Sequence, residues 1–244
     1  MSHQPPATHN PQHVTRNPLI WVIGLGKFGQ AALPKLIRRF PEAHILGVDS
    51  SPDRIRQAAG SGVVTLQADG VTFVADHLSL DTDADSWPDW IIPALPRHLA
   101  AEWLVARMGS DLQRRPVPEE IDAQVPHPLR GAEGTLYASW ADFQCPDDCP
   151  EPVEKCTVTG LGHPQPLYDR LASLLLPGYT AWCVRSRQLA PGLGGYQPVD
   201  LISILKKISQ PGTSNNFLVA TACRCHGVID ALIRPQVGVT ADNQ

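Results

Sequence analysis

The sequence lacks any hydrophobic run long enough to cross a membrane. Its apolar runs, such as residues 171–176, fall far short of the ~20 residues that a transmembrane helix needs. It also lacks a basic excess, since the formal net charge is −4, and phosphate binding to nucleic acid usually requires a basic face. Residues 1–18 are polar and proline-rich without the apolar core of a secretion signal, and they predict a disordered tail. We therefore expect a cytoplasmic protein that contacts neither nucleic acid nor the membrane interior.

What is present is enough apolar sequence for a large core. Hydrophobic residues make up 43% of the 244 residues, which suits one large α/β domain or a domain with an appended lobe. In the first half, buried-type strands alternate with amphipathic helices. The expected strands are residues 19–23, 44–48, 62–66 and 89–95, and the expected helices are residues 30–40, 51–59, 70–77 and 97–108. This alternation predicts a doubly wound, mostly parallel, Rossmann-like sheet.

The second half alternates less regularly. Its expected strands are residues 135–143, 180–184 and 217–221, and its expected helices are residues 167–176, 199–208 and 227–233. This half either extends the first sheet or forms a second small α/β lobe. The predicted organisation is a tail (1–18), a Rossmann-like unit (19–108), a proline-rich and charged linker (109–134) and a cysteine-bearing α/β half (135–244).

A glycine motif follows the first expected strand. Gly24-Leu25-Gly26-Lys27-Phe28-Gly29 matches G-x-G-x-x-G and opens a helix. In that context the first glycine allows a tight turn, the second lets backbone amides approach a pyrophosphate, and the third lets helix and strand pack closely. The amide dipoles at the helix start favour the anion. Gly24, Gly26 and Gly29, with Lys27 and Phe28 between them, are therefore predicted to bind a dinucleotide.

An acidic residue ends the second expected strand. Asp49 lies 20 residues beyond Gly29, where a carboxylate accepts hydrogen bonds from ribose hydroxyls and disfavours a 2′-phosphate. Ser50 adjoins it in the predicted site. NAD(H) is therefore the expected cofactor, although Arg54 and Arg56 leave NADP as an alternative.

Three segments carry a resemblance to a known family. The runs IWVIGLGKFGQAALPKL, GVDSSPDRI and VVTLQADGVT are similar to the TrkA-N nucleotide-binding domain of potassium-conductance regulators (RCK domains). In that family the phenylalanine before the third glycine is common, and the acid after the second strand holds the adenosine ribose. The resemblance implies these roles for Phe28 and Asp49, and places Asp69 near the adenine. It covers residues 19–108, and no C-terminal ligand lobe, second repeat or channel segment of the family follows.

The second half holds all six cysteines. Without a secretion signal, structural disulfides are not expected, because the cytosol keeps thiols reduced. Cys145 and Cys149 follow one expected strand, and Cys223 and Cys225 follow another, so in a parallel sheet both pairs would lie on the ligand-binding edge. The predicted metal ligands are Cys145, Cys149, Cys223 and Cys225, with Cys156 and His226 in reserve. Cys183 lies inside an apolar strand and is expected to pack in the core.

Three interpretations of the cysteines stay open. They form a zinc or iron–sulfur site, a redox thiol pair, or unrelated buried and surface thiols. Two functions follow: an NAD(H)-dependent oxidoreductase or electron-transfer protein, or a non-catalytic nucleotide or redox sensor of the TrkA-N type. A homodimer or a redox partner protein fits either function. No complete proton-transfer or nucleophile arrangement is evident; His98, after the fourth strand, is either a proton donor or a helix-start residue.

Overall fold

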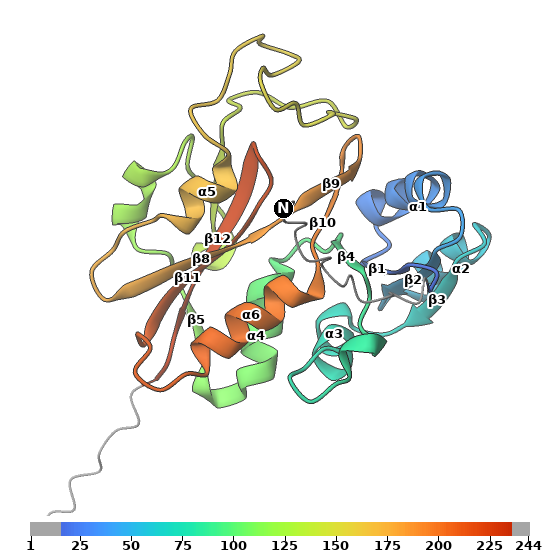
Figure 1. Cartoon of the computed structure of the whole chain (residues 1–244), viewed down its shortest axis with the longest axis horizontal. Helices are drawn as coiled ribbons and strands as arrows, with labels where there is room; N and C mark the ends of the chain where they lie inside the picture. Colours follow the sequence, from blue (N-terminus) through green and yellow to red (C-terminus); the bar gives the residue numbers. More distant parts are fainter. Residues whose placement is uncertain (1–15, 236–244) are drawn as a thin grey trace, which may run out of the picture.

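The structure is a computed structural model that describes residues 16–235 (Figure 1). It is a mixed α/β protein with a parallel sheet in the first half and a larger, mainly antiparallel sheet in the second, which confirms the predicted α/β class. Most of the expected tail lies outside the described residues. No helix within residues 16–235 is long and apolar enough to cross a membrane.

The N-terminal sheet has four parallel strands in the order β3-β2-β1-β4. The strands are β1 (Leu19–Ile23), β2 (His44–Asp49), β3 (Val64–Gln67) and β4 (Trp90–Pro93), and the helices are α1 (Lys27–Arg39), α2 (Pro52–Ala59), α3 (Gly70–His77) and α4 (Leu99–Met108). The run at β1 is continuously apolar because both faces are covered. Ile20 and Val22 pack in the core beside α1, whereas Trp21 and Ile23 pack in the core shared with α3 and α4.

The C-terminal sheet has the order β6-β7-β12-β11-β8, with β5 also pairing with β12. Its strands are β5 (Gln113–Arg115), β6 (Leu129–Arg130), β7 (Leu136–Ser139), β8 (Tyr179–Arg185), β11 (Asn216–Ala222) and β12 (His226–Ile233). Only β8 and β11 pair in parallel. The expected linker, residues 109–134, contributes β5 and β6 to this sheet, and a 3-10 helix at Glu119–Gln124 lies between them. A hairpin of β9 (Arg187–Ala190) and β10 (Leu193–Gly195) follows β8, and a bridge from Tyr196 to Ile91 ties it to β4.

The expected helix at residues 227–233 is wrong, because this segment is strand β12. It pairs with β11 along its length, from Gly227 opposite Ala222 to Ile233 opposite Asn216. Ile229 packs in the core on one face of the sheet and Leu232 in the core on the other. A strand covered on both faces gives a short continuous apolar run, and such a run has no period that distinguishes it from a helix.

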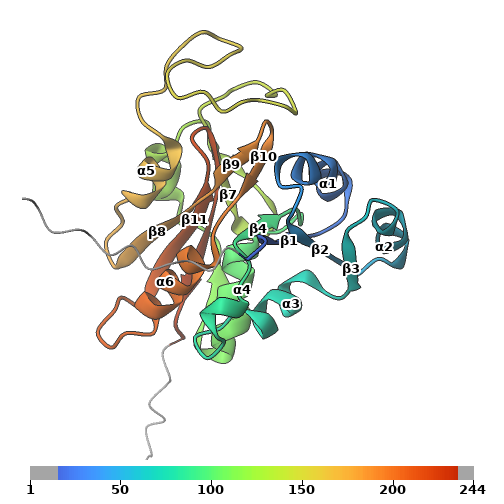
Figure 2. The same cartoon turned by 45° about the vertical axis from the view of Figure 1, so that its right-hand side comes forward.

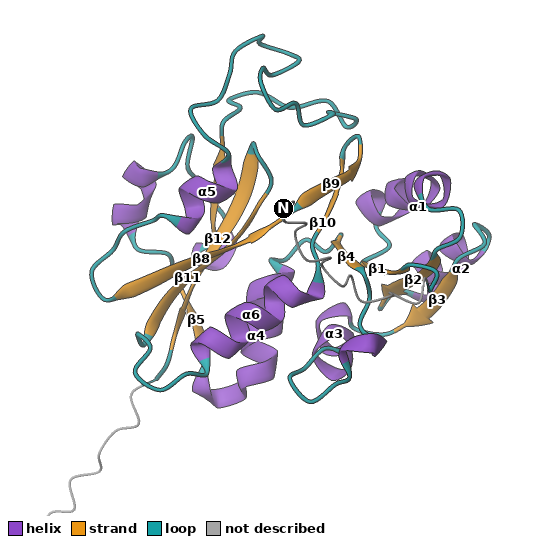
Figure 3. Ribbon diagram, viewed as in Figure 1, coloured by secondary structure: helices purple, strands orange, loops and turns teal. Residues whose placement is uncertain are grey.

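Helices α4 and α6 (Pro198–Ile208) lie between the two sheets (Figures 2 and 3). One core cluster runs from Ile23 of β1 through Trp103 of α4 to Phe217 of β11, so the two sheets share a hydrophobic interior. Helix α5 (Leu167–Ala172) covers the opposite face of the C-terminal sheet. This shared core fixes the ends of the two sheets relative to each other.

Candidate functional site

Two glycines of the loop between β1 and α1 are required by the packing of the chain itself. Gly24 has a φ of +99°, and a Cβ there would lie 2.7 Å from the carbonyl oxygen of Ala94. A Cβ on Gly29 would overlap the carbonyl oxygen of Gly24. Both positions therefore accept only glycine, and the reasons are structural. Gly24 adopts a positive φ beside β4, and Gly29 lies where the helix and the loop approach closely.

Gly26 differs from its two neighbours in the motif. Its φ of −69° suits any residue, and a Cβ there would meet nothing nearer than the Arg54 guanidinium at 3.9 Å. Gly26 is also the N-cap of α1, with no side chain bonded to the cap and no acidic residue in the first turn. The start of α1 therefore has neither a capping side chain at its N-cap nor an acidic residue in its first turn, which leaves it suited to an anion at the helix N-terminus.

Asp49 sits at the carboxyl end of β2, as predicted, and it holds the loop in place. One carboxylate oxygen accepts a hydrogen bond from the Leu25 amide at 2.7 Å, and the other accepts from the Ser51 amide at 2.8 Å. The carboxylate is only 3% exposed, and the Arg54 guanidinium lies 3.5 Å from it. A ribose contact by Asp49 stays a prediction. Ser50 is exposed beside it.

Asp69 has a structural task in the described chain. Its carboxylate caps α3 by accepting from the backbone amide of Thr72 at 2.9 Å, and it pairs with Arg97 at 3.3 Å. The Thr72 amide, followed by the Thr72 hydroxyl and Arg97, keeps the pKa of Asp69 below its usual value despite partial burial. An adenine contact by Asp69 stays a prediction.

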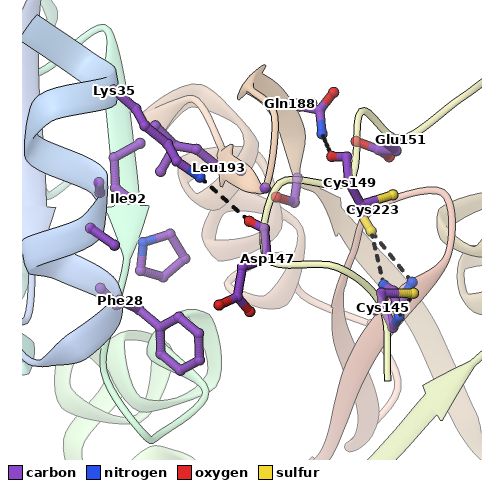
Figure 4. A pocket seen from close by; sticks show the side chains of 18 of the residues that line it. Phe28, Lys35, Ile92, Cys145, Asp147, Cys149, Glu151, Gln188, Leu193 and Cys223 are labelled. Carbon is purple, nitrogen blue, oxygen red and sulfur yellow. Dashed lines mark hydrogen bonds between the residues drawn. The ribbon is translucent and has the colours of Figure 1, made fainter. Parts of the chain in front are cut away.

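The four first-choice cysteines line one cavity with the start of α1 (Figure 4). This cavity, of about 440 Å³, is called the cysteine cavity. The residues that define it here are Lys27, Phe28, Cys145, Cys149, Cys223, Cys225 and His226. The convergence follows from strand direction: β7 and β11 are each antiparallel to β12, so they run the same way and end at one edge. The four cysteines thus lie around one cavity, although the sheet that carries them is mainly antiparallel and separate from the parallel sheet of the glycine loop. Metal binding by them stays a prediction.

Hydrogen bonds to backbone groups join the cysteine segments to one another and to α1. The Arg224 amide donates to the Glu151 carboxylate at 2.6 Å, which joins the turn between β11 and β12 to the loop after β7. The Gly192 amide and the Gln188 side chain both donate to the carbonyl oxygen of Cys149, at 2.9 and 2.7 Å. Lys35 of α1 donates to the carbonyl oxygens of Pro191 at 2.7 Å and of Asp147 at 3.4 Å, and Figure 4 shows the contact with Asp147. The N-terminal unit therefore contacts the β9–β10 hairpin, which supports the loop that carries Cys145 and Cys149.

The four cysteines of the cavity are free thiols, and two of them lie close to polar groups of the turn between β11 and β12. Cys145 Sγ lies 3.5 Å from His226 Nε2, and Cys223 Sγ accepts from the backbone amides of Cys225 and His226, each at 3.4 Å. Burial, with Cys223 and Glu151 nearby, raises the pKa of Cys225 to about 12. Burial also raises the pKa values of Cys145 and Cys223. In residues 16–235 no three His, Cys, Asp or Glu side chains converge on one point as ligands of an ion.

Two other cysteines lie apart from the lining of the cavity. Backbone amides of Thr159 and Val158 and the Thr159 hydroxyl lower the pKa of Cys156. Cys183 packs against the core on the α5 side, as expected, and burial raises its pKa to about 12. Of the two reserve ligands, His226 lines the cavity and Cys156 does not.

Sequence reasoning missed the residues that support this site. No motif surrounds Lys35, Gln188 or Glu151, because their contacts depend on tertiary approach. Gly192 is the exception, since it belongs to a glycine-rich turn in the sequence. The structure explains this glycine: its φ is +67°, and a Cβ there would overlap the Asp147 carbonyl oxygen. His98 lines a second cavity rather than the cysteine cavity.

The fold and site define an α/β protein with a glycine-loop unit joined to a cysteine-bearing half. Residues 100–234, more than half of the chain, match the family described as "Uncharacterized protein, C-terminal domain", and the chain belongs to this family. An "Uncharacterized protein" of Archaeoglobus fulgidus is 37% identical over 153 residues, which cover 60% of this chain and 66% of that relative. No solved structure matches the chain.

Proposed function

We propose that this protein binds NAD(H) at the glycine loop and exchanges electrons between its nicotinamide and the cysteine cavity. The observation that carries the proposal is that Lys27 and Phe28 serve both places. They form the first residues of α1, beside the open position at Gly26, and they also line the cavity with the four cysteines. A dinucleotide with its pyrophosphate at the α1 amides has its nicotinamide half within reach of that cavity.

The electron acceptor or donor in the cavity would be a cysteine-bound iron–sulfur centre or a thiol pair, whereas a zinc ion would hold the cysteines without exchanging electrons. Cys145, Cys149, Cys223 and Cys225, with His226, supply soft sulfur and imidazole ligands of the kind that zinc and iron–sulfur centres use. Burial raises the pKa values of three of these thiols, so a bound metal would be needed to hold them as thiolates at neutral pH. The two amide hydrogen bonds to Cys223 Sγ would support its thiolate form.

A sensor of the TrkA-N type is the second candidate, and the Lys35 contacts favour it. Lys35 on α1 reaches the carbonyl oxygens of Pro191 and, at 3.4 Å, Asp147. The state of the thiols would therefore be transmitted to the helix that binds the pyrophosphate. In this case NAD(H) binds without turnover, and its affinity changes when the thiols are oxidised or metallated.

The test is to titrate the full chain, purified without oxygen, with NADH, and to measure its iron, zinc and acid-labile sulfide. NADH oxidation is then followed with an artificial electron acceptor, in the wild type and in Cys225→Ser. Saturable binding with turnover that Cys225→Ser removes supports the redox function. Binding without turnover supports the sensor, and no binding of NADH overturns both.

A further inference from the structure

A second cavity of about 400 Å³ is lined by residues of β4, the turn after it and the start of α4, together with Tyr196 and residues of the C-terminal sheet. We call it the His98 cavity; its lining includes Leu95, His98, Tyr137, Tyr196, Thr221 and Val228. No cysteine lines it, and Pro93 is the residue that it shares with the cysteine cavity. Its walls are mainly apolar, and the polar groups among them are the His98 imidazole, three hydroxyl-bearing side chains and Arg97.

Three of the residues around this cavity form a hydrogen-bonded relay. His98 Nδ1 lies 2.8 Å from Asp230 Oδ2, and His98 Nε2 lies 2.8 Å from Thr221 Oγ1. The His98 and Asp230 side chains are 3% and 2% exposed. The residues come from the start of α4 and from two neighbouring strands, so the tertiary structure assembles the relay from segments more than a hundred residues apart.

The hydrogen-bond partners of Asp230 determine which nitrogen of His98 carries a proton. Burial alone would raise the pKa of Asp230, but hydrogen bonds from His98, Thr135 and Arg114 bring it below its usual value. An ionised carboxylate only accepts, so His98 Nδ1 carries the proton. In the neutral imidazole Nε2 is then the acceptor, and the Thr221 hydroxyl donates to it. This is the arrangement that activates a hydroxyl for nucleophilic attack.

A fourth group completes the cavity. The Tyr196 hydroxyl is buried and has no hydrogen-bond partner among residues 16–235. Burial raises the pKa of Tyr196, so the hydroxyl keeps its proton and remains a donor. A buried donor without a partner is unfavourable until a ligand or water satisfies it, and a carbonyl oxygen that becomes negatively charged is a suitable acceptor.

We propose that Thr221 is a nucleophile, activated by His98 and positioned through Asp230, for small and mostly apolar esters bound in the His98 cavity. Thr221 Oγ1 bonds to the ester carbonyl carbon while its proton passes to His98 Nε2, and the Tyr196 hydroxyl donates to the carbonyl oxygen. The ester C–O bond then breaks, and the leaving alcohol takes the proton from Nε2. Water attacks the acyl-threonine by the same route, which releases the carboxylic acid and restores Thr221. This activity is independent of the proposed dinucleotide function.

The test uses the full chain with two probes, a small alkyl fluorophosphonate and 4-nitrophenyl acetate. We expect one phosphonyl group on Thr221 by peptide mass spectrometry, and ester hydrolysis above the rate of Thr221→Val. Thr221→Ser should retain or exceed the wild-type rate, because it keeps the hydroxyl and removes the hindering methyl group. Tyr196→Phe should lower the acylation rate roughly 100-fold, as loss of an oxyanion donor does.

The controls separate chemistry from folding. Thr221→Val keeps the size and β-branching of the residue in a strand, so its circular dichroism and NADH binding should equal those of the wild type. An unlabelled Thr221 in the wild type, or ester hydrolysis equal in the wild type and Thr221→Val, would show that the relay is structural and overturn the inference. That result leaves NADH binding untouched, so failure here is distinguishable from failure of the proposed function.

Discussion

The N-terminal unit alternates strands with helices, whereas the C-terminal half mostly joins strand to strand, and the two regions build their sites differently. In the first, the glycine loop, its helix and Asp49 lie within 26 residues, and all four strands run parallel. In the second, the site depends on β12, which pairs with β5 and β7 from much earlier in the chain. The glycine loop is thus a local structure, whereas the cysteine cavity exists only when distant strands have paired. Substitutions should therefore act differently in the two regions.

The largest expected effect is that of Gly29→Ala on stability. A methyl group there overlaps the Gly24 carbonyl oxygen, a backbone atom that cannot move without opening the loop. We expect the free energy of unfolding to fall by about 3 kcal/mol, the upper range for overpacking. Gly26→Ala has no such contact, so its stability loss should stay below about 1 kcal/mol, while NADH affinity falls at least tenfold because the methyl group occupies the pyrophosphate approach. Urea unfolding and NADH titration measure the two quantities.

Gly60→Ala is the matched control for both variants. Gly60 has an ordinary φ of −72°, and a Cβ there lies 4.0 Å from its nearest neighbour, the Gln57 carbonyl oxygen. Neither stability nor NADH affinity should fall. Unchanged NADH affinity in Gly26→Ala would contradict the assignment of this glycine to the pyrophosphate.

A smaller and more local effect is expected in the C-terminal half from Gly192→Ala. The new methyl group overlaps the Asp147 carbonyl oxygen and displaces the loop that carries Cys145 and Cys149. We expect a cost of roughly 2 kcal/mol and faster alkylation of these two cysteines, with NADH affinity nearly unchanged. Gly160→Ala is the control, since Gly160 has a similar φ of +70° and open space around it. Equal alkylation rates in the two variants would mean that the contact with Asp147 does not hold the loop.

The same contrast explains what could be predicted from the sequence. β1 and the loop after it were predictable because buried strand, glycines and helix start follow one another directly. The convergence of Cys145 with Cys223 was predicted from a parallel edge, and it survives because β7 and β11 run the same way although β12 lies between them. Strand β12 was predicted as a helix, because burial on both faces removes the alternation of polar and apolar residues that marks a strand. Lys35, and the placement of His98 between Thr221 and Asp230, depend on tertiary approach and leave no local pattern.

The smallest expected effect concerns Asp69, which has a cap role in the structure and an adenine role by resemblance. Asp69→Ala should lower the free energy of unfolding by about 1 kcal/mol, whereas Asp69→Asn keeps the cap and should lose only a few tenths.

Because the pKa of Asp69 is lowered from 3.8 by folding, the stability from its charge is present above that pH and is lost as the pH falls through the folded pKa. The wild type and Asp69→Asn should therefore become equally stable in acid. Their charge-dependent difference is small at neutral pH, because Asp69 is half exposed and solvent screens its pair with Arg97. Urea unfolding over a pH series measures these differences. Asp69→Asn also separates the two roles, since a fall in NADH affinity without a fall in stability would place the carboxylate at the adenine, and unchanged affinity would leave it as a helix cap alone.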